Sequence, residues 1–391
     1  MNRQSKGVLV ILLALGMVCG LAACGGEEAF YDADSTADCL PGDEFDPDEQ
    51  VCYVGEATDG VVAASSEWWA DYAESPEDCY EDEVYDPVDQ LCYLADGASA
   101  DASAEYGSLF DDILATFWGD EQDYADMEEL GENVIITYEV NGNTIGSPQE
   151  TAVTSDLRPY QTDTATHEAI WIYFASLIPV EQRTYVSKYA IFTDGPENVY
   201  AAVTQDGDNP NSWVLAIDIV DATDQQELTY SLIHEFGHLL TLNDSQVNLD
   251  PTLFYQQDDE ALYNEAYAAC PTYFPGEGCS RPDSYINLFY DRFWADLEDE
   301  VWELEAIDDE GEYEEAVFAF YERHADQFVT DYAATNVGED IAESWTAFVL
   351  QSRPTGRSIA EQKVLFFYEF PELVRLRSEI SARTFSRLRQ R

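Results

Sequence analysis

The chain has 391 residues, 46% of them hydrophobic and 13% aromatic, so it can bury a core large enough for one large domain or two. Its 80 acidic residues outnumber the 17 basic ones and give a formal net charge of −63. A field of this sign repels nucleic acids and anionic lipid head groups, which excludes them as partners. The carboxylates are spread through most of the chain, which favours a general surface adaptation over an acidic ligand-binding site.

Residues 1–23 have the pattern of a targeting segment. A positively charged start and an apolar stretch, residues 8–23, precede Cys24. The sequence Leu21-Ala-Ala-Cys24-Gly resembles the lipobox of bacterial lipoproteins, which implies cleavage before Cys24 and lipidation of its sulfur. An ordinary secretory signal and a short membrane helix are the alternatives. We therefore expect an extracytoplasmic protein, held at the surface of a bacterial membrane only by its N-terminal lipid, in a compartment where disulfides persist.

Residues 24–104 form an acidic segment with an internal duplication, spanning residues 39–53 and 79–93. Each copy has two cysteines separated by twelve residues, an aromatic-Asp-Pro core and a closing Cys-Tyr. Two cysteines per copy predict one disulfide per copy, Cys39 with Cys52 and Cys79 with Cys92. The acidic loops could bind Ca²⁺, but they lack the ligand spacing of an EF-hand, so Ca²⁺ stays a weak alternative. The segment is predicted to be a tether stapled by disulfides.

The main domain is predicted to cover residues 105–391 and to alternate between helix and strand. Helical spacing is present at residues 108–118 and 167–177, and strand patterns at residues 133–140, 189–192, 199–203 and 213–220, with a loop at residues 206–211. A helix around residue 234 follows. A run of arginines near the C-terminus predicts a last helix that pairs with the acidic body, with contact to the membrane surface as the weaker alternative. Together these elements predict an α+β fold.

Residues 234–238 read His-Glu-Phe-Gly-His and are the strongest chemical signal in the chain. On a helix, His234 and His238 project from one face, and two imidazoles at this spacing can bind one Zn²⁺. Glu235 can then take a proton from a water molecule beside the metal. A chance match on a buried core helix is the alternative. The other two histidines, His167 and His324, are expected to be hydrogen-bonded structural residues.

Zinc needs a third protein ligand, and the sequence offers two routes. The metzincin continuation would use Asp244, but it requires a glycine where Thr241 stands, and without that glycine the chain cannot easily turn. The other route takes a glutamate from a later helix. Glu339 and Glu343 share one face of a predicted helix, so one could bind the metal while the other holds a ligand histidine. Two solvated carboxylates are the alternative, although the residues around them are apolar.

The motif Tyr332-x-x-Thr-Asn-x-x-Glu339-x-x-Ala-Glu343, with His-Glu-Phe-Gly-His upstream, resembles the catalytic domain of anthrax lethal factor and its bacterial relatives, which are gluzincin metallopeptidases. The resemblance covers roughly residues 160–350 and implies a zincin-like domain, with a mixed sheet, an active-site helix and a helical lower half. It implies that His234, His238 and Glu339 bind zinc. It further implies that Glu235 is the general base, that Tyr332 stabilises the oxyanion and that Glu343 holds a ligand histidine.

Residues 245–330 separate the two motifs and are interpreted as an insertion. This stretch contains Cys270 and Cys279, which are expected to pair, and helical patterns at residues 283–304 and 312–323. The sequence therefore predicts a monomeric, lipid-anchored zinc endopeptidase that acts on a peptide or protein substrate. A catalytically silent zincin-fold surface protein that serves as a binding partner or scaffold is the alternative. A Ca²⁺-dependent adhesion protein is a third, supported only by the cysteine repeats.

Overall fold

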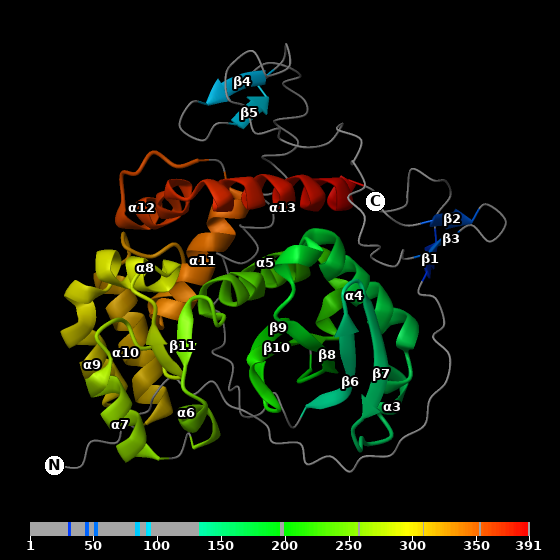
Figure 1. Ribbon diagram of the computed structural model, residues 1–391, viewed down its shortest axis with the longest axis horizontal. Coiled ribbons are helices and arrows are strands. Elements are labelled where there is room, and N and C mark those ends of the chain that lie inside the picture. Colours follow the sequence, from blue (N-terminus) through cyan, green and yellow to red (C-terminus); the bar gives the residue numbers. More distant parts are fainter. Residues whose placement is uncertain are drawn as a thin grey trace. The chain divides into compact units, whose positions relative to one another are not determined.

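The computed structural model describes residues 133–195, 199–256, 259–307, 309–351 and 353–389, together with the backbone of five short N-terminal strands (Figure 1). These strands are β1 (Phe30–Asp32), β2 (Glu44–Asp46), β3 (Val51–Tyr53), β4 (Glu83–Asp86) and β5 (Leu91–Leu94). β2 pairs with β3 and β4 with β5, both antiparallel, and Cys52 and Cys92 lie at equivalent places opposite Phe45 and Tyr85. The duplicated sequence thus forms two hairpins of the same register. Cys24, Cys39, Cys79, the signal segment and the helix expected at residues 108–118 lie outside the described residues.

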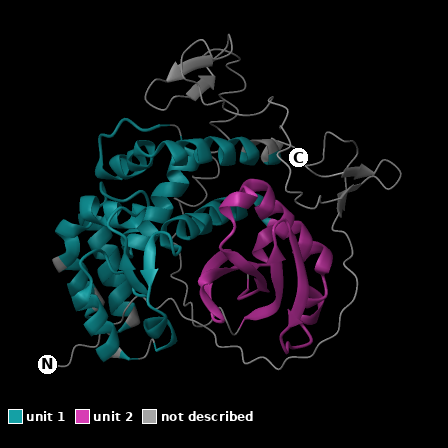
Figure 2. Cartoon of the chain, in the orientation of Figure 1, with its two compact units in different colours: residues 1–11, 69–125, 224–391 teal, residues 12–68, 126–223 magenta. Residues whose placement is uncertain are grey.

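The chain divides into two compact units (Figure 2), and the described main body is split between residues 223 and 224. Residues up to Thr223 of this body belong to the unit that contains Asp126–Thr223. Residues from Asp224 onward belong to the unit that contains Asp224–Arg391. In the part of the chain that the structure describes, every helix is too short or too polar to span a bilayer.

A five-stranded mixed sheet forms the centre of the unit before residue 224. Its strand order is β7-β6-β8-β10-β9; only β8 and β10 run parallel, and all other neighbours are antiparallel. The elements are β6 (Val134–Asn141), β7 (Thr144–Glu150), α3 (Arg158–Gln161), α4 (Thr164–Leu177), η3 (Val180–Gln182), β8 (Val186–Phe192), β9 (Ala201–Asp206), β10 (Asn209–Asp218) and η4 (Asp221–Thr223). A mixed α+β architecture is therefore confirmed.

Helix α4 packs on this sheet through large apolar side chains. Trp171 and Phe174 are buried on α4, and the Trp171 ring lies against Tyr189 of β8 with ring centroids 5.4 Å apart. Trp171 donates its indole N–H to the carbonyl of Asn143, so even this polar atom is satisfied. A tight turn joins β6 to β7, with Gly142 at a positive φ of 62° that glycine adopts without strain.

Two sheet predictions were incomplete. The loop expected at residues 206–211 is a tight connection, because β9 continues to Asp206 and β10 already begins at Asn209. Strand β7 was not predicted, since it is largely exposed and interrupted by Gly146 and Pro148, which weaken the strand pattern.

The unit after residue 223 is mostly helical. Its elements are α5 (Gln225–Leu242), β11 (Val247–Leu249), α6 (Pro251–Tyr255), α7 (Glu260–Ala269), β12 (Gly278–Ser280), α8 (Tyr285–Phe293), η5 (Ala295–Leu297), α9 (Glu298–Glu305), α10 (Glu310–Arg323), η6 (Tyr332–Ala334), α11 (Val337–Leu350), α12 (Ile359–Phe366), η7 (Phe367–Glu369) and α13 (Pro371–Arg389). The helix predicted at residues 283–304 is broken at Trp294, and the arginine-rich C-terminal helix is present as α13.

Helices α5 and α11 pack closely against each other. A Cβ placed on Gly237 of α5 would lie 3.1 Å from both the Cα of Ala342 and the Cδ1 of Trp345 on α11. The absence of a side chain at Gly237 therefore lets the two backbones approach. The rings of Phe236 and Trp345 pack against each other with their centroids 5.9 Å apart. Helix α11 is buried along almost its whole length. This contact sets the distance between residues carried by the two helices.

Helix α11 is held at both ends. At its start the side chain of Asn336 accepts a hydrogen bond from the N–H of Glu339, as an N-cap does. At its end Arg377 of α13 donates to the carbonyls of Phe348 and Gln351, which no turn of α11 can satisfy. One of the C-terminal arginines thus stabilises this helix directly.

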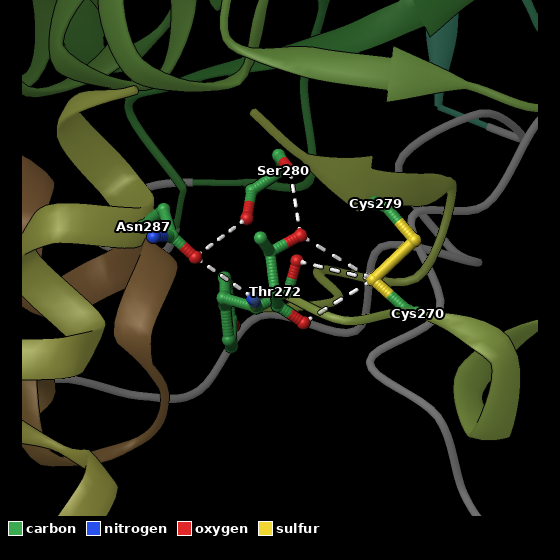
Figure 3. The surroundings of a disulfide bond; sticks show 6 residues. Cys270, Thr272, Cys279, Ser280 and Asn287 are labelled. Carbon is green, nitrogen blue, oxygen red and sulfur yellow. Dashed lines mark hydrogen bonds between the residues drawn. A yellow bond between two sulfur atoms is a disulfide. The ribbon is translucent and has the colours of Figure 1, made fainter. Parts of the chain in front are cut away.

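The predicted disulfide between Cys270 and Cys279 is confirmed (Figure 3). It joins the residue after α7 to β12, and β12 pairs with β11, which follows α5 closely in the chain. Thr272 donates to the carbonyl of Ser280 at 2.6 Å, and the Asn287 side chain accepts from the Ser280 hydroxyl at 3.1 Å. The covalent bond and this network fix the same short segment of residues 270–287.

Candidate metal centre

The first two residues of the site lie on α5. Asp224 caps this helix, its side chain accepting from the N–H groups of Gln226 and Glu227, and an apolar face from Leu228 onward is buried. His234 and His238 fall four residues apart on that buried face. Their positions follow from the helical period alone.

Three side chains from two helices converge on one point. The Nε2 atoms of His234 and His238 are 3.1 Å apart, and an oxygen of Glu339 on α11 lies 3.0 Å from the first and 3.3 Å from the second. His234, His238 and Glu339 form a group whose ligand atoms lie close enough together to hold one ion. The structure therefore brings together the three residues that the sequence proposed as ligands.

Glu343, one turn further along α11, controls the orientation of His234. One of its oxygens lies 2.7 Å from Nδ1 of His234, and the other accepts from Tyr230 Oη at 2.6 Å and Thr330 Oγ1 at 2.8 Å. As a carboxylate, Glu343 can only accept, so Nδ1 of His234 carries the proton. The lone pair of His234 is thereby placed on Nε2, which faces His238 and Glu339.

The protonation of the cluster reflects its crowding. Burial disfavours the imidazolium of His234, but hydrogen bonds to Glu339 and Glu343 outweigh it and raise the pKa of His234 well above its usual value. Burial works in the opposite direction on Glu339, yet the two histidines hold the pKa of Glu339 well below its usual range.

The arrangement fits zinc. Zn²⁺ takes imidazole nitrogens and carboxylate oxygens at about 2.0–2.2 Å, and tetrahedral bonds of that length separate neighbouring ligands by about 3.3 Å. The observed separations of 3.0 to 3.3 Å match this value. Nδ1 of His238 is buried and has no hydrogen-bond partner among the described residues. The orientation of this ring, with Nε2 toward the ion position, is therefore not opposed by a hydrogen bond at Nδ1.

Glu235 and Tyr332 lie near the group formed by His234, His238 and Glu339. Glu235 is 8% exposed. The ring centroids of Tyr332, on η6, and of His234 are 5.9 Å apart. Burial, together with the charges of Glu339 and Glu235, raises the pKa of Tyr332 well above its usual value. The phenol therefore stays protonated and can act as a hydrogen-bond donor.

The alternatives considered from the sequence fall elsewhere. Within the described residues, Asp244 is not among the carboxylates that group with the histidines; its backbone carbonyl accepts a hydrogen bond from Arg281. His167 bonds to the Tyr138 hydroxyl and the Tyr160 carbonyl, which uses both ring nitrogens. His324 bonds to Glu300 and Gln327. Both histidines are therefore hydrogen-bonded within the fold, as predicted.

Two residues that contact Glu343, Tyr230 and Thr330, lie outside the sequence motifs. Tyr230 lies one turn before His234 on α5, a position that the spacing alone could have indicated. Thr330 belongs to the segment before η6 and offered no signal, because its role depends on the tertiary contact with Glu343.

A second group of carboxylates lies in the other unit. Asp194, Asp218 and Asp221 are within 4.8 Å of one another. Burial is the main cause that raises the pKa of Asp218, to about 7, and the charge of Asp221 adds to it. The hydroxyl and N–H groups around Asp218 work against this shift but do not cancel it.

We compared the chain with protein-family models, curated proteins and solved structures, and none of them matches it. The functional interpretation therefore depends on the residues and their geometry.

Proposed function

We propose that this protein is a zinc-dependent endopeptidase of the gluzincin class, with a zincin-like domain. The observation that carries the proposal is the convergence of His234, His238 and Glu339 at separations that match the ligands of one zinc ion. Glu235 follows His234 directly and is the one further acid that the motif provides for proton transfer.

The proposed mechanism assigns one task to each residue. Zinc, when bound by His234, His238 and Glu339, would lower the pKa of a water molecule and polarise the scissile carbonyl. Glu235 accepts the proton of the attacking water and passes it to the leaving amine. Tyr332, whose phenol is protonated at neutral pH, donates a hydrogen bond to the oxygen on which negative charge develops.

We further propose that the protein works outside the cytoplasm. The lipobox-like sequence before Cys24 supports cleavage of residues 1–23 and attachment of lipid to Cys24. The disulfide between Cys270 and Cys279 fits an oxidising compartment. The substrate would then be a peptide or protein that reaches the surface of the membrane.

The test uses the full chain after signal removal, incubated with a peptide library with and without a chelator. We expect cleavage that the chelator abolishes and that zinc restores. Glu235→Gln should keep zinc and lose cleavage by a factor of about 10²–10⁴ or more. Glu227→Gln, in the first turn of the same helix, serves as the control and should behave as the wild type.

Other outcomes would contradict the proposal. Zinc bound in unit amount without cleavage of any peptide would favour a zincin-fold protein that serves as a binding partner or scaffold. A chain that binds no zinc would remove the basis for both readings.

A further inference from the structure

The hydroxyl of Thr330 connects two parts of the proposed active site. It donates to an oxygen of Glu343 at 2.8 Å and accepts from the N–H of Ala333 at 3.1 Å. Thr330 is 5% exposed and Glu343 is 2% exposed, so water does not compete for these bonds. Ala333 belongs to η6, the single turn that also carries Tyr332.

The direction of each bond is fixed by chemistry. The N–H of Ala333 can only donate, so Thr330 Oγ1 accepts there, and its own proton goes to Glu343, which as a carboxylate can only accept. Glu343 in turn holds His234 through Nδ1. One hydroxyl therefore lies in a continuous chain of bonds that runs from His234 through Glu343 to the turn of Tyr332.

Tyr230 makes a useful contrast. It donates to the same oxygen of Glu343 at 2.6 Å, but it lies on α5, beside His234, rather than on the segment that carries Tyr332. Tyr230 thus supports only the histidine side of the site, whereas Thr330 supports both sides.

We propose that Thr330 is a positioning residue that couples the metal-holding His234 to the catalytic turn of Tyr332. The inference rests on the proposed function and names a residue that none of the sequence motifs contains. Loss of the hydroxyl leaves the N–H of Ala333 buried without its partner and removes one of two donors from an oxygen of Glu343. Both the grip on His234 and the position of Tyr332 should then loosen together.

The experiment compares Thr330→Val, which keeps the shape and removes the hydroxyl, with Thr330→Ser, which keeps the hydroxyl. Thr346→Val is the matched control, because Thr346 is a buried threonine of α11 whose hydroxyl bonds only to the carbonyl of Ala342 in its own helix. Tyr230→Phe tests the histidine side alone. Zinc affinity is measured by chelator competition on the full chain, and kcat and KM on the zinc-saturated protein.

We expect Thr330→Val to weaken zinc binding by about 10-fold, the lower end of the loss on removing a partner of a ligand, because Thr330 acts on His234 only through Glu343. Its kcat should also fall, by about 10-fold or more, with KM little changed, because the donor is displaced from the oxyanion position. Thr330→Ser should restore both values. Tyr230→Phe should weaken zinc binding but lower kcat less than Thr330→Val, and Thr346→Val should change neither value.

The inference is overturned if Thr330→Val and Thr346→Val have equal effects, or if zinc affinity and kcat do not change together in Thr330→Val. Circular dichroism checks that each variant is folded, and Thr330→Ala replaces Thr330→Val should the latter not fold. Failure of the proposed function would look different, since the wild type itself would then bind no zinc or cleave no peptide.

Discussion

At the scale of single residues, His234 shows how a neighbour decides what a side chain can do. Either ring nitrogen of a neutral imidazole can carry the proton, and Glu343, 2.7 Å from Nδ1, assigns it to that atom. In the neutral imidazole the lone pair is then on Nε2, which faces His238 and Glu339. A histidine at the same place without this carboxylate would divide its population between two tautomers.

The role of Tyr332 can be tested by removing one atom. Tyr332→Phe should lower kcat by about 10²–10³, the usual cost of losing one donor to a developing oxyanion, while KM and zinc content stay close to wild type. Tyr255→Phe, a change at an exposed tyrosine of α6 that packs on Phe254, is the control. Unchanged kcat in Tyr332→Phe would show that another group supplies the hydrogen bond.

Asp218 predicts a pH dependence of stability in the other unit. Its folded pKa is raised from 3.8 to about 7, so between roughly pH 4 and pH 7 the folded chain binds a proton that the unfolded chain has already lost. Stability contributed by this group is therefore lost as the pH rises through that window, with a slope of up to about 1.4 kcal/mol per pH unit.

Asp218→Asn should remove that slope. The amide resembles the protonated carboxyl. The difference in unfolding free energy between wild type and variant should therefore be smaller at pH 5 than at pH 8, and the variant should become more stable relative to the wild type as the pH rises. Urea unfolding midpoints at the two pH values measure this. A stability difference between the two chains that does not change with pH would show that Asp218 does not titrate in this range.

At the scale of elements, the contact between α5 and α11 determines the site. The sequence predicted that Glu339 and Glu343 share a helical face, and this holds because both belong to α11. It did not predict that the helix begins only after Asn336, which leaves Tyr332 on a separate 3₁₀ turn. The side chains of Asp331 and Thr330 accept hydrogen bonds from the N–H groups of Tyr332 and Ala333, and these bonds hold the turn before the helix.

Gly237 is the point where this contact can be altered. Gly237→Ala places a Cβ 3.1 Å from the buried Ala342 and Trp345, so α11 must move away by a few tenths of an ångström. We expect a loss of about 1–3 kcal/mol in unfolding free energy, which exceeds the gain of about 1 kcal/mol from better helix propensity. Zinc affinity should fall as well, because Glu339 moves with α11.

Gly311→Ala is the matched control for this experiment. Gly311 lies in α10, and a Cβ there would meet only Asp309 at an ordinary 3.7 Å, so the change should be neutral or stabilising. If Gly237→Ala is as stable as Gly311→Ala and binds zinc as the wild type does, the close approach of α5 and α11 is not what sets the ligand geometry.

At the scale of the whole molecule, features that depend on short stretches of sequence could be predicted, whereas the pairing of the strands could not. The helix of the His-Glu-Phe-Gly-His motif and the disulfide between Cys270 and Cys279 follow from short stretches of sequence. The strand order could not be predicted, because β9 lies at the edge of the described sheet and pairs there only with β10. Strand β8 is therefore the parallel neighbour of β10 and not the neighbour of β9, which follows β8 in the chain. Such choices depend on the packing of residues far apart in the chain.

The central claim is that one zinc ion is held by His234, His238 and Glu339. Its most direct test is the metal content of the full chain after dialysis, measured for the wild type, Glu339→Gln and Asp244→Asn. The account predicts one zinc per chain in the wild type and in Asp244→Asn, and a large loss of zinc in Glu339→Gln. Zinc absent from the wild type, or lost in Asp244→Asn and kept in Glu339→Gln, would contradict it.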